Sequence, residues 1–288
     1  MAVAMSDVSA LTLVKNRDRH LHRLVEGLQR SAVLPRELVI VDMSDTPVAL
    51  HGTAFPIRIV RLETGALPLA RARNLAAAEA TGDHLLFLDV DCIPAAGLVQ
   101  RIDDELRRAD VLVCAEVRYL AEDAVDDGWT EAGLAALAAP HPVRPFPMKG
   151  RRIEPNAGLF WSLTFGIRRE TFRRVGGFDE TFTGYGAEDT DFGFRCRDAG
   201  LPLAFAGGGP GSFHQHHGVY DPPLQHFEDI VRNATRFQAR WGVWAMEGWL
   251  EAFDRLELVA FDGRTLTRRR PPTPDEIEAA HRPPDVRY

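Results

Sequence analysis

Apolar and polar positions alternate regularly through the first part of the chain. Short apolar runs predict strands, and apolar residues at helical spacing predict helices between them. The predicted strands are residues 10–14, 37–41, 57–62 and 84–88, and the predicted helices are residues 21–28 and 68–80. This order is typical of an α/β domain with a largely parallel sheet. In such a sheet, ligands bind beyond the carboxyl ends of the strands.

The pattern is less regular in the second part of the chain, which begins with an apolar segment at residues 156–167. The predicted helices there are residues 168–174, 188–199 and 229–253, and the predicted strand is residues 201–206. Residues 140–155 contain five prolines and four basic residues, so we predict a linker or a lid without regular structure. From residue 264 onward, the charged, proline-rich sequence predicts a loosely held tail.

Composition limits the class of protein. A chain of 288 residues with 45% hydrophobic and 26% charged residues can bury the core of one large domain or two small ones. Its net charge of −7 argues against nucleic acid as a partner, because a nucleic-acid site needs a basic surface. We expect no transmembrane segment, since no apolar run reaches the roughly 18 residues of a span. The first ten residues also lack the features of a signal peptide.

The three cysteines point to the compartment. Cys92, Cys114 and Cys196 are widely spaced and fit neither a disulfide framework nor a zinc site. We therefore predict buried thiols in a reducing compartment. The expected location is the cytoplasm, including a peripheral position at the inner membrane face.

Two aspartates follow the apolar run of LLFLDVDC, residues 85–92. Carboxylates one residue apart repel each other, but beyond the end of a strand Asp89 and Asp91 can converge on one cation. Mg²⁺ and Mn²⁺ accept such oxygen ligands and keep phosphate oxygens and water in their other positions. The pair thus indicates a metal and a phosphorylated substrate, and the alternative is a solvated acidic strand exit.

The segment GYGAEDTDFGFR, residues 184–195, places three acids at the start of a predicted helix. Glu188, Asp189 and Asp191 would offset the helix macrodipole there, which is the structural alternative to a functional role. Gly184 and Gly186 allow a ligand to approach the backbone closely. A carboxylate held at this position can serve as a general base toward a substrate hydroxyl.

Three histidines cluster in SFHQHHGVY, residues 212–220, and imidazole is a common metal ligand. Strand alternation predicts His214 and His216 on one face and His217 on the other. A separate zinc site is the competing interpretation, but neither a matching cysteine pair nor an HExxH motif is present. We therefore expect histidine to complete the coordination sphere begun by the aspartates.

These motifs together resemble a known family. LVIVDMSD, LARARN, FLDVDCIP, VGGFDETFTGYGAEDTDFGFR and the histidine cluster occur in this order between about Ala10 and Trp241. The chain resembles the inverting glycosyltransferases of family 2 and the related galactosyltransferases. The resemblance implies the GT-A fold, an α/β single large domain with a Rossmann-like, mainly parallel central sheet flanked by helices. It also implies that residues 1–110 bind the nucleotide sugar, that residues 111–228 bind the acceptor and catalyse transfer, and that residues 229–288 form a C-terminal helix and tail.

On the donor side, the resemblance implies that Asp42 hydrogen-bonds the nucleotide base, with Asp45 as the alternative because VDMSD departs from the VDDGS of many relatives. Arg73 resembles the arginine near the base and the phosphates, with Arg71 as a less certain neighbour. The remaining residues expected at the donor are Asn16, Asp89 and, on the 140–155 loop, Lys149 or Arg151.

On the catalytic side, the resemblance implies that Asp89 and Asp91 hold Mn²⁺ or Mg²⁺, with Asp91 as the direct ligand. His217 best matches a late metal-binding histidine of the galactosyltransferases, and His214 is next. Asp189 matches the general base, and Glu188 would help to hold the acceptor. The segment QARW, residues 238–241, is one residue shorter than the QxxRW of processive synthases, so polymer synthesis is not inferred.

The implied function is metal-dependent, inverting transfer of a sugar from a nucleotide-diphosphate sugar to an acceptor hydroxyl. A UDP-sugar is favoured and a GDP-sugar is the second choice, and the acceptor is a saccharide or another hydroxyl compound. The alternatives are a phosphatase of the haloacid dehalogenase type, a sugar-phosphate nucleotidyltransferase, and a sugar-binding protein without catalysis.

Overall fold

The first four strands form one half of a large sheet. The computed structural model describes residues 5–50, 52–64, 67–283 and 286–287. Strands β1 (Val8–Val14), β2 (Glu37–Asp42), β3 (Ile57–Arg61) and β4 (His84–Leu88) run parallel in the order β3-β2-β1-β4. Helices α1 (Asp18–Gln29) and α2 (Leu69–Glu79) connect them. The predicted elements are confirmed here, with boundaries shifted by at most two residues in the strands and three in the helices.

The other half of the sheet contains antiparallel strands. Its order continues β10-β6-β11-β9, with β6 (Leu112–Ala115) and β11 (Leu203–Ala206) parallel to each other. β10 (Thr164–Arg168) runs antiparallel between β4 and β6, and β9 (Arg151–Glu154) runs antiparallel to β11. The α/β class is confirmed, while the sheet as a whole is mixed. The strand β9 also corrects the expectation that residues 140–155 lack regular structure.

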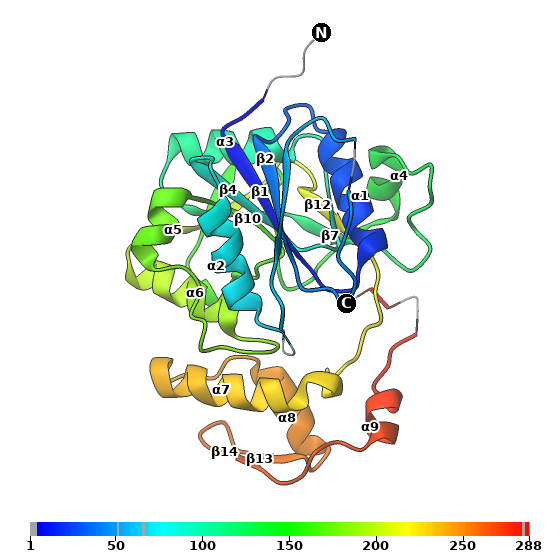
Figure 1. Cartoon of the computed structure of the whole chain (residues 1–288). Coiled ribbons are helices and arrows are strands. Elements are labelled where there is room, and N and C mark those ends of the chain that lie inside the picture. Colours follow the sequence, from blue (N-terminus) through cyan, green and yellow to red (C-terminus); the bar gives the residue numbers. More distant parts are fainter. Residues whose placement is uncertain (1–4, 51, 65–66, 284–285, 288) are drawn as a thin grey trace.

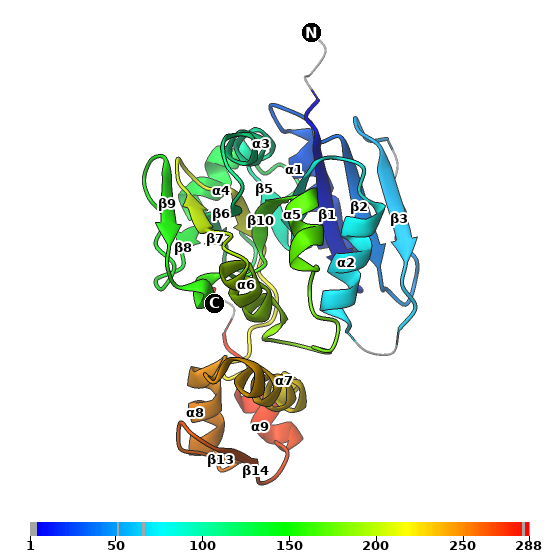
Figure 2. The same ribbon diagram turned by 90° about the vertical axis from the view of Figure 1, so that its left-hand side faces the viewer.

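Alternating side chains of the strands pack into two apolar layers, one on each face of the sheet. On one face, Val8 and Ala10 pack with α1 and with α3 (Leu98–Arg108). On the other face, Leu11 and Leu13 pack with α2, α5 (Arg169–Val175) and α6 (Glu188–Asp198). Figure 2 shows the helices on both sides of the sheet. The three cysteines are free and buried, as predicted.

A second, smaller sheet joins segments that are far apart in the sequence. It has the order β5-β12-β7-β8, with β5 (Cys92–Pro94), β12 (Ser212–His214), β7 (Val117–Tyr119) and β8 (Ala139–Pro140). Helix α4 (Glu131–Leu137) precedes β8. In the antiparallel pair β5–β12, His214 lies opposite Cys92. The register therefore brings the histidine segment beside the second aspartate of FLDVDC.

The C-terminal segment forms a layer of its own beyond the carboxyl ends of the strands (Figure 1). The predicted helix at 229–253 is wrong, because the chain forms α7 (Phe227–Trp241) and α8 (Glu247–Arg255) instead. Gly242 ends α7 with a φ of 71°, a left-handed conformation that glycine adopts without strain. Met246, with a φ of 58°, begins α8.

The expected loose tail is also wrong. Residues after 264 form β14 (Leu266–Arg268), which pairs with β13 (Val259–Phe261), and α9 (Pro274–Ala279). Leu266 and Ile277 pack against the apolar cluster of α7 and α8. Burial of these side chains stabilises a segment that its charge and proline content alone would leave unstructured.

One buried carboxylate ties this layer to the rest of the protein. Asp191 on α6 accepts hydrogen bonds from Arg240 Nη1 at 2.8 Å and from Trp241 Nε1 at 2.9 Å, both on α7. Arg195 pairs with its other oxygen at 2.8 Å. The RW pair of QARW thus has a structural role, since it fixes the C-terminal helices against α6. No helix among the described residues is long and apolar enough to cross a membrane.

Candidate active site

Three segments meet at the carboxyl edge of the sheet: the end of β4, the start of α6 and the loop after β12. The Oδ1 of Asp91 lies 3.4 Å from His214 Nε2, and its Oδ2 lies 3.6 Å from His217 Nε2. The possible ligand atoms of these three residues all lie within 4.8 Å of one another. The backbone N–H of Gln215 donates to the carbonyl of Asp91 at 2.7 Å, which holds the histidine loop in place.

The electrostatics of this cluster suit a cation. Burial alone would raise the pKa of Asp91, but His214, His217 and Arg17 together bring that pKa below its ordinary value. Burial lowers the pKa of His214, and it lowers the pKa of His217 to about 4. At neutral pH the cluster therefore offers one carboxylate and two neutral imidazoles with available lone pairs.

The donor set fits a divalent metal ion, and it distinguishes between the two expected ions. Imidazole nitrogen is a poor ligand for Mg²⁺, which binds through carboxylates, phosphates and water, whereas Mn²⁺ accepts mixed nitrogen and oxygen ligands. Arg17 Nη1 lies 2.6 Å from Asp91 Oδ2. The guanidinium would therefore have to share or release that oxygen when a metal binds.

The predicted alternation of the histidines is wrong. Strand β12 ends at His214, so the chain no longer alternates through the next residues. His217 joins His214 at Asp91, with ring centres 5.2 Å apart. His216 instead contributes its carbonyl, 3.2 Å from His20 Nε2 on α1.

Asp89 lies outside this cluster. Its Oδ1 is 3.5 Å from Arg73 Nη2, and Arg73 Nη1 donates to Glu188 Oε1 at 2.9 Å. Burial raises the pKa of Asp89 to about 7, although Arg73 opposes the shift. The Asp89 side chain is 29% exposed, so a ligand can reach it. Arg73 is buried and contacts Asp89 from the protein interior.

The start of α6 holds Asp189 in a strained turn. Ala187 precedes the helix with a φ of 70°, in the left-handed region that is unfavourable for a residue with a Cβ. Oδ1 of Asp189 accepts the N–H of Thr190 at 2.6 Å, and Oδ2 accepts the N–H of Ser162 at 3.4 Å. Burial and the neighbouring Glu188 raise the pKa of Asp189 to about 6. A half-buried carboxylate with this pKa is suited to take up a proton near neutral pH.

Asp42 is wholly buried, and both oxygens of its carboxylate accept hydrogen bonds from the protein. Its carboxylate accepts the N–H groups of Ser44 at 2.9 Å and Val48 at 3.0 Å, and it pairs with Arg61 at 2.6 Å. Burial opposes ionisation, yet these donors keep the pKa of Asp42 below its ordinary value. The carboxylate therefore shapes the loop after β2, and contact with a nucleotide base would require this loop to move.

Of the other residues expected at the donor, Asn16 lies at the rim beside the alternative base contact. Asn16 Nδ2 donates to Asp45 Oδ2, and the N–H of Asp45 donates to Asn16 Oδ1, both at 2.9 Å. Arg71 is exposed on α2, and Lys149 is exposed on the 140–155 loop. Neither belongs to the cluster around Asp91.

The 140–155 loop is anchored by an arginine that we did not single out. Arg144 is buried, with its guanidinium 4.7 Å from the ring centre of Trp161 and 5.3 Å from that of Phe205. The sequence motifs assign no role to Arg17 or Ser162 either. Arg17 directly follows Asn16 at the end of the first strand, so its position was a usable signal, whereas nothing local in the sequence marks Arg144 or Ser162.

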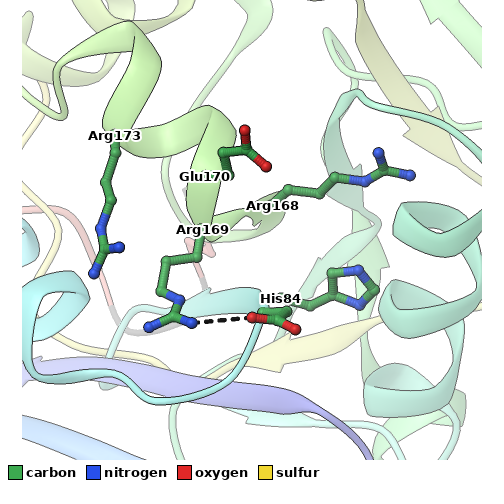
Figure 3. Close-up of a pocket in the computed structure, with 6 residues that line it drawn as sticks. His84, Arg168, Arg169, Glu170 and Arg173 are labelled. Carbon is green, nitrogen blue, oxygen red and sulfur yellow. Dashed lines mark hydrogen bonds and ion pairs between the residues drawn. The ribbon is translucent and has the colours of Figure 1, made fainter.

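A pocket of about 440 Å³ lies at the opposite edge of the sheet, where β4 begins and β10 ends (Figure 3). Several of its lining side chains are already paired: Arg169 contacts Asp83 at 3.0 Å, and Arg168 Nε donates to the carbonyl of Leu106 at 2.8 Å. His84 Nδ1 lies 2.7 Å from Asp103. None of the residues predicted for the site lines this pocket.

Comparison with known proteins identifies the family. The model of glycosyl transferase family 2 matches residues 9–176, more than half of the chain, and the chain belongs to this family. A model described as the N-terminal domain of galactosyltransferase matches residues 154–217, which span Asp189 and the histidines. The resemblance drawn from the motifs is confirmed. Membership of this family also decides against the phosphatase and nucleotidyltransferase alternatives.

Curated relatives are glycosyltransferases of greater length. The validoxylamine A glucosyltransferase of Streptomyces hygroscopicus subsp. limoneus is 27% identical over 231 residues, which cover 70% of this chain and 51% of that protein. The pre-mycofactocin glycosyltransferase of Mycobacterium tuberculosis is 28% identical over 205 residues, covering 69% of this chain and 41% of that protein. The chain thus spans about half the length of the curated relatives it matches.

Solved structures confirm the GT-A fold. GalNAc-T7 with UDP, GalNAc and Mn²⁺ matches with a TM-score of 0.54 at 18% identity, over 73% of this chain and 43% of that one. Residues 1–349 of S. aureus TarS in complex with UDP-GlcNAc match with a TM-score of 0.53 at 14% identity, over 80% of this chain and 66% of that one. At these identities the likeness concerns the fold.

Proposed function

We propose that this protein transfers a sugar from a nucleotide-diphosphate sugar to an acceptor hydroxyl, with inversion at the anomeric carbon. The observation that carries the proposal is the juxtaposition of the Asp91–His214–His217 cluster with Asp189. Residues 162 and 163 connect Asp189 to the end of β4, two residues before Asp91, since Ser162 donates to Asp189 and the carbonyl of Leu163 accepts the N–H of Asp89 at 2.8 Å. A UDP-sugar is the favoured donor, as in the matching structures that contain UDP or UDP-GlcNAc.

In the proposed reaction, Asp189 removes the proton from the acceptor hydroxyl. The acceptor oxygen then forms a bond to the anomeric carbon from the face opposite the leaving group. The bond between that carbon and the diphosphate breaks, and its electron pair leaves with the diphosphate. Single displacement inverts the configuration, so no nucleophile of the protein is needed.

Asp91, His214 and His217 would hold the metal, and the donor set favours Mn²⁺ over Mg²⁺. A bound divalent cation neutralises charge that develops on the diphosphate. Arg17, beside Asp91, adds a fixed positive charge at the same place. Asp89 remains a proposed donor contact because its side chain is partly exposed at the site.

The other assignments stay proposals with different support. Asn16 and Asp45 at the rim are available to a donor as they stand, whereas Asp42 needs loop movement. Buried Arg73 would orient Asp89 and Glu188, and Arg71 and Lys149 would approach the donor only from solvent. We also retain residues 1–110 as the donor half, 111–228 as the acceptor half and the cytoplasm as the location.

The test is nucleotide binding. Calorimetry with UDP, GDP and dTDP, each with and without Mn²⁺, should show Mn²⁺-dependent binding that is strongest for UDP. Asp91→Ala should abolish the dependence on Mn²⁺, because it removes the charged member of the cluster. Asp104→Asn, an exposed aspartate on α3, is the matched control and should bind as wild type does. Unchanged Mn²⁺-dependent affinity in Asp91→Ala would refute the metal assignment.

A further inference from the structure

A second cavity, of about 420 Å³, lies between the main sheet domain and the C-terminal helices. Its walls come from the segment before β10, from α6, from the turn between α7 and α8, and from the first residues of α8. Figures 1 and 2 both show α6 facing α7 across this boundary. The lining residues that matter here are Trp161, Thr190, Phe194, Trp244, Glu247 and Trp249.

The cavity shares its wall with the proposed base. Thr190 lines it and donates its N–H to Asp189 at 2.6 Å. Trp161 lines it as well, and the next residue, Ser162, donates its N–H to the other oxygen of Asp189 at 3.4 Å. Asp189 is not itself among the described residues that line the cavity, but both N–H groups that hold its carboxylate belong to a lining residue or to the residue next to one, so the cavity lies directly beside the proposed base.

The cavity is also connected to the metal cluster, through a row of aromatic rings. Ring centres are 4.9 Å apart from His214 to Tyr119, 5.6 Å from Tyr119 to His141, and 4.9 Å from His141 to Trp161. Trp161 ends this row at the cavity. The cavity and the cluster thus lie at the two ends of one row of aromatic rings.

The chemistry of the lining is aromatic with a polar rim. Trp161, Phe194, Trp244 and Trp249 are half-buried, so part of each ring is open to the cavity. Trp244 Nε1 donates to the carbonyl of Gly263 at 3.0 Å, and its ring packs edge-on with Phe261 at 5.4 Å between ring centres, so this indole is held in place at the cavity. Aromatic faces pack against the C–H faces of saturated rings, while a few polar groups orient the hydroxyls.

Glu247 is the single charged residue among the described residues that line the cavity. Two nearby arginines lie against the rings instead: Arg144 over Trp161 at 4.7 Å and Arg197 over Phe194 at 4.4 Å. Arg197 is also paired with Asp198 at 2.8 Å. An anionic ligand would meet the carboxylate of Glu247 without a lining cation to balance it.

We propose that this cavity is the acceptor subsite and that it selects a neutral, ring-shaped polyol over an anionic one. The inference rests on the proposed function, because it takes Asp189 as the base. It adds the class of acceptor, a saccharide or cyclitol without phosphate or carboxylate, and it names the aromatic rings and Glu247 as the residues that discriminate.

The experiment measures UDP release from UDP-glucose with Mn²⁺ in the presence of matched probes. Methyl glucoside and myo-inositol are the neutral probes, and glucuronate and glucose 6-phosphate are the anionic ones. We expect the neutral probes to change the rate, by accepting glucose or by excluding water, at concentrations about tenfold lower than the anionic probes. Glu247→Gln should reduce this difference in effective concentration between anionic and neutral probes. Glu251→Gln, one turn further along α8 and exposed, should leave the difference unchanged.

The aromatic lining has its own variants. Trp249→Leu should raise the KM for the neutral probe about tenfold, and Trp249→Phe, which keeps a ring, should raise it less. Leu256→Ala, a change in a partly exposed side chain after α8, controls for loss of apolar volume in this layer. Thermal melting of each variant shows whether the C-terminal layer remains folded.

The outcomes separate the two proposals. If UDP neither binds with Mn²⁺ nor is released from any donor, the proposed function fails, and the acceptor assignment fails with it. If UDP binds normally but no neutral probe changes its release, the acceptor assignment alone is overturned. The acceptor assignment is also overturned if the anionic probes change UDP release at the same concentrations as the neutral probes. It is overturned as well if Trp249→Leu and Trp249→Phe leave the KM for the neutral probe unchanged.

Discussion

The proposed donor side and the proposed acceptor side of this site are built from different groups. The donor side consists of charged and imidazole side chains around Asp91, held at fixed distances by pairing and by the backbone contact from Gln215. The acceptor side consists of half-buried aromatic rings contributed by three separate segments. If both assignments hold, charge positions the diphosphate, whereas the shape of the aromatic cavity selects the acceptor.

The largest effect is expected from the carboxylate that lies between the two sides. Asp189→Asn should lower kcat by about 10²–10⁴-fold, because an amide cannot take the acceptor proton. UDP binding with Mn²⁺ should be kept, since Asp189 is not part of the Asp91 cluster. Steady-state kinetics and calorimetry measure the two quantities, and a variant with most of its turnover left would show that the base is elsewhere.

The next prediction compares two adjacent histidines. His217→Ala should weaken Mn²⁺-dependent UDP binding by about 10–100-fold, because its Nε2 faces Asp91 at 3.6 Å. His216→Ala should have a much smaller effect on that affinity, because the variant keeps the carbonyl that contacts His20, and Nε2 of His216 has no hydrogen-bond partner among the described residues. Equal losses in the two variants would mean that the loop, and not a particular imidazole, is what matters.

The pH dependence separates the base from the metal cluster. The pKa of Asp189 is raised to about 6, so below pH 6 the carboxyl becomes protonated and kcat should fall about tenfold per pH unit. The metal cluster should keep its charge between pH 7 and pH 6, since the pKa of Asp91 is lowered and that of His217 is about 4, so a change in UDP affinity over this range would come from Asp89, whose pKa is about 7. A kcat profile that is flat down to pH 5 would contradict this assignment.

The smallest expected effect concerns the identity of the ion. Replacing Mn²⁺ by Mg²⁺ should weaken UDP binding several-fold, because two of the three protein ligands are imidazoles. Titration of UDP in each metal at the same concentration measures the ratio. Tighter binding with Mg²⁺ would argue for an all-oxygen site that includes Asp89.

Local patterns predicted the parallel strands of the main sheet and the helices that pack on it. The strand at 84–88 agrees with β4 residue for residue, and the helix at 188–199 differs from α6 by one residue. Prediction failed in the C-terminal layer, where Gly242 divides one expected helix into two and packing holds the tail. Periodicity reports a tendency to bury one face, but it does not report where a glycine ends an element or what covers a polar segment.

The site shows the same division. The sequence alone was enough to select the site residues Asp91, Asp189 and the histidines as candidates. Carboxylates at the end of a strand and at the start of a helix occupy positions that a ligand can reach. The tertiary structure alone decided which of them meet. The pairing of strand β12 with strand β5 places His214 and His217 at Asp91. Hydrogen bonds within the protein already use the carboxylate of Asp42, so it does not face the site. The packing of α7 and α8 against the rest of the protein forms the aromatic cavity. The physical reason is that contacts between distant segments depend on strand register and packing, which no local window of sequence contains.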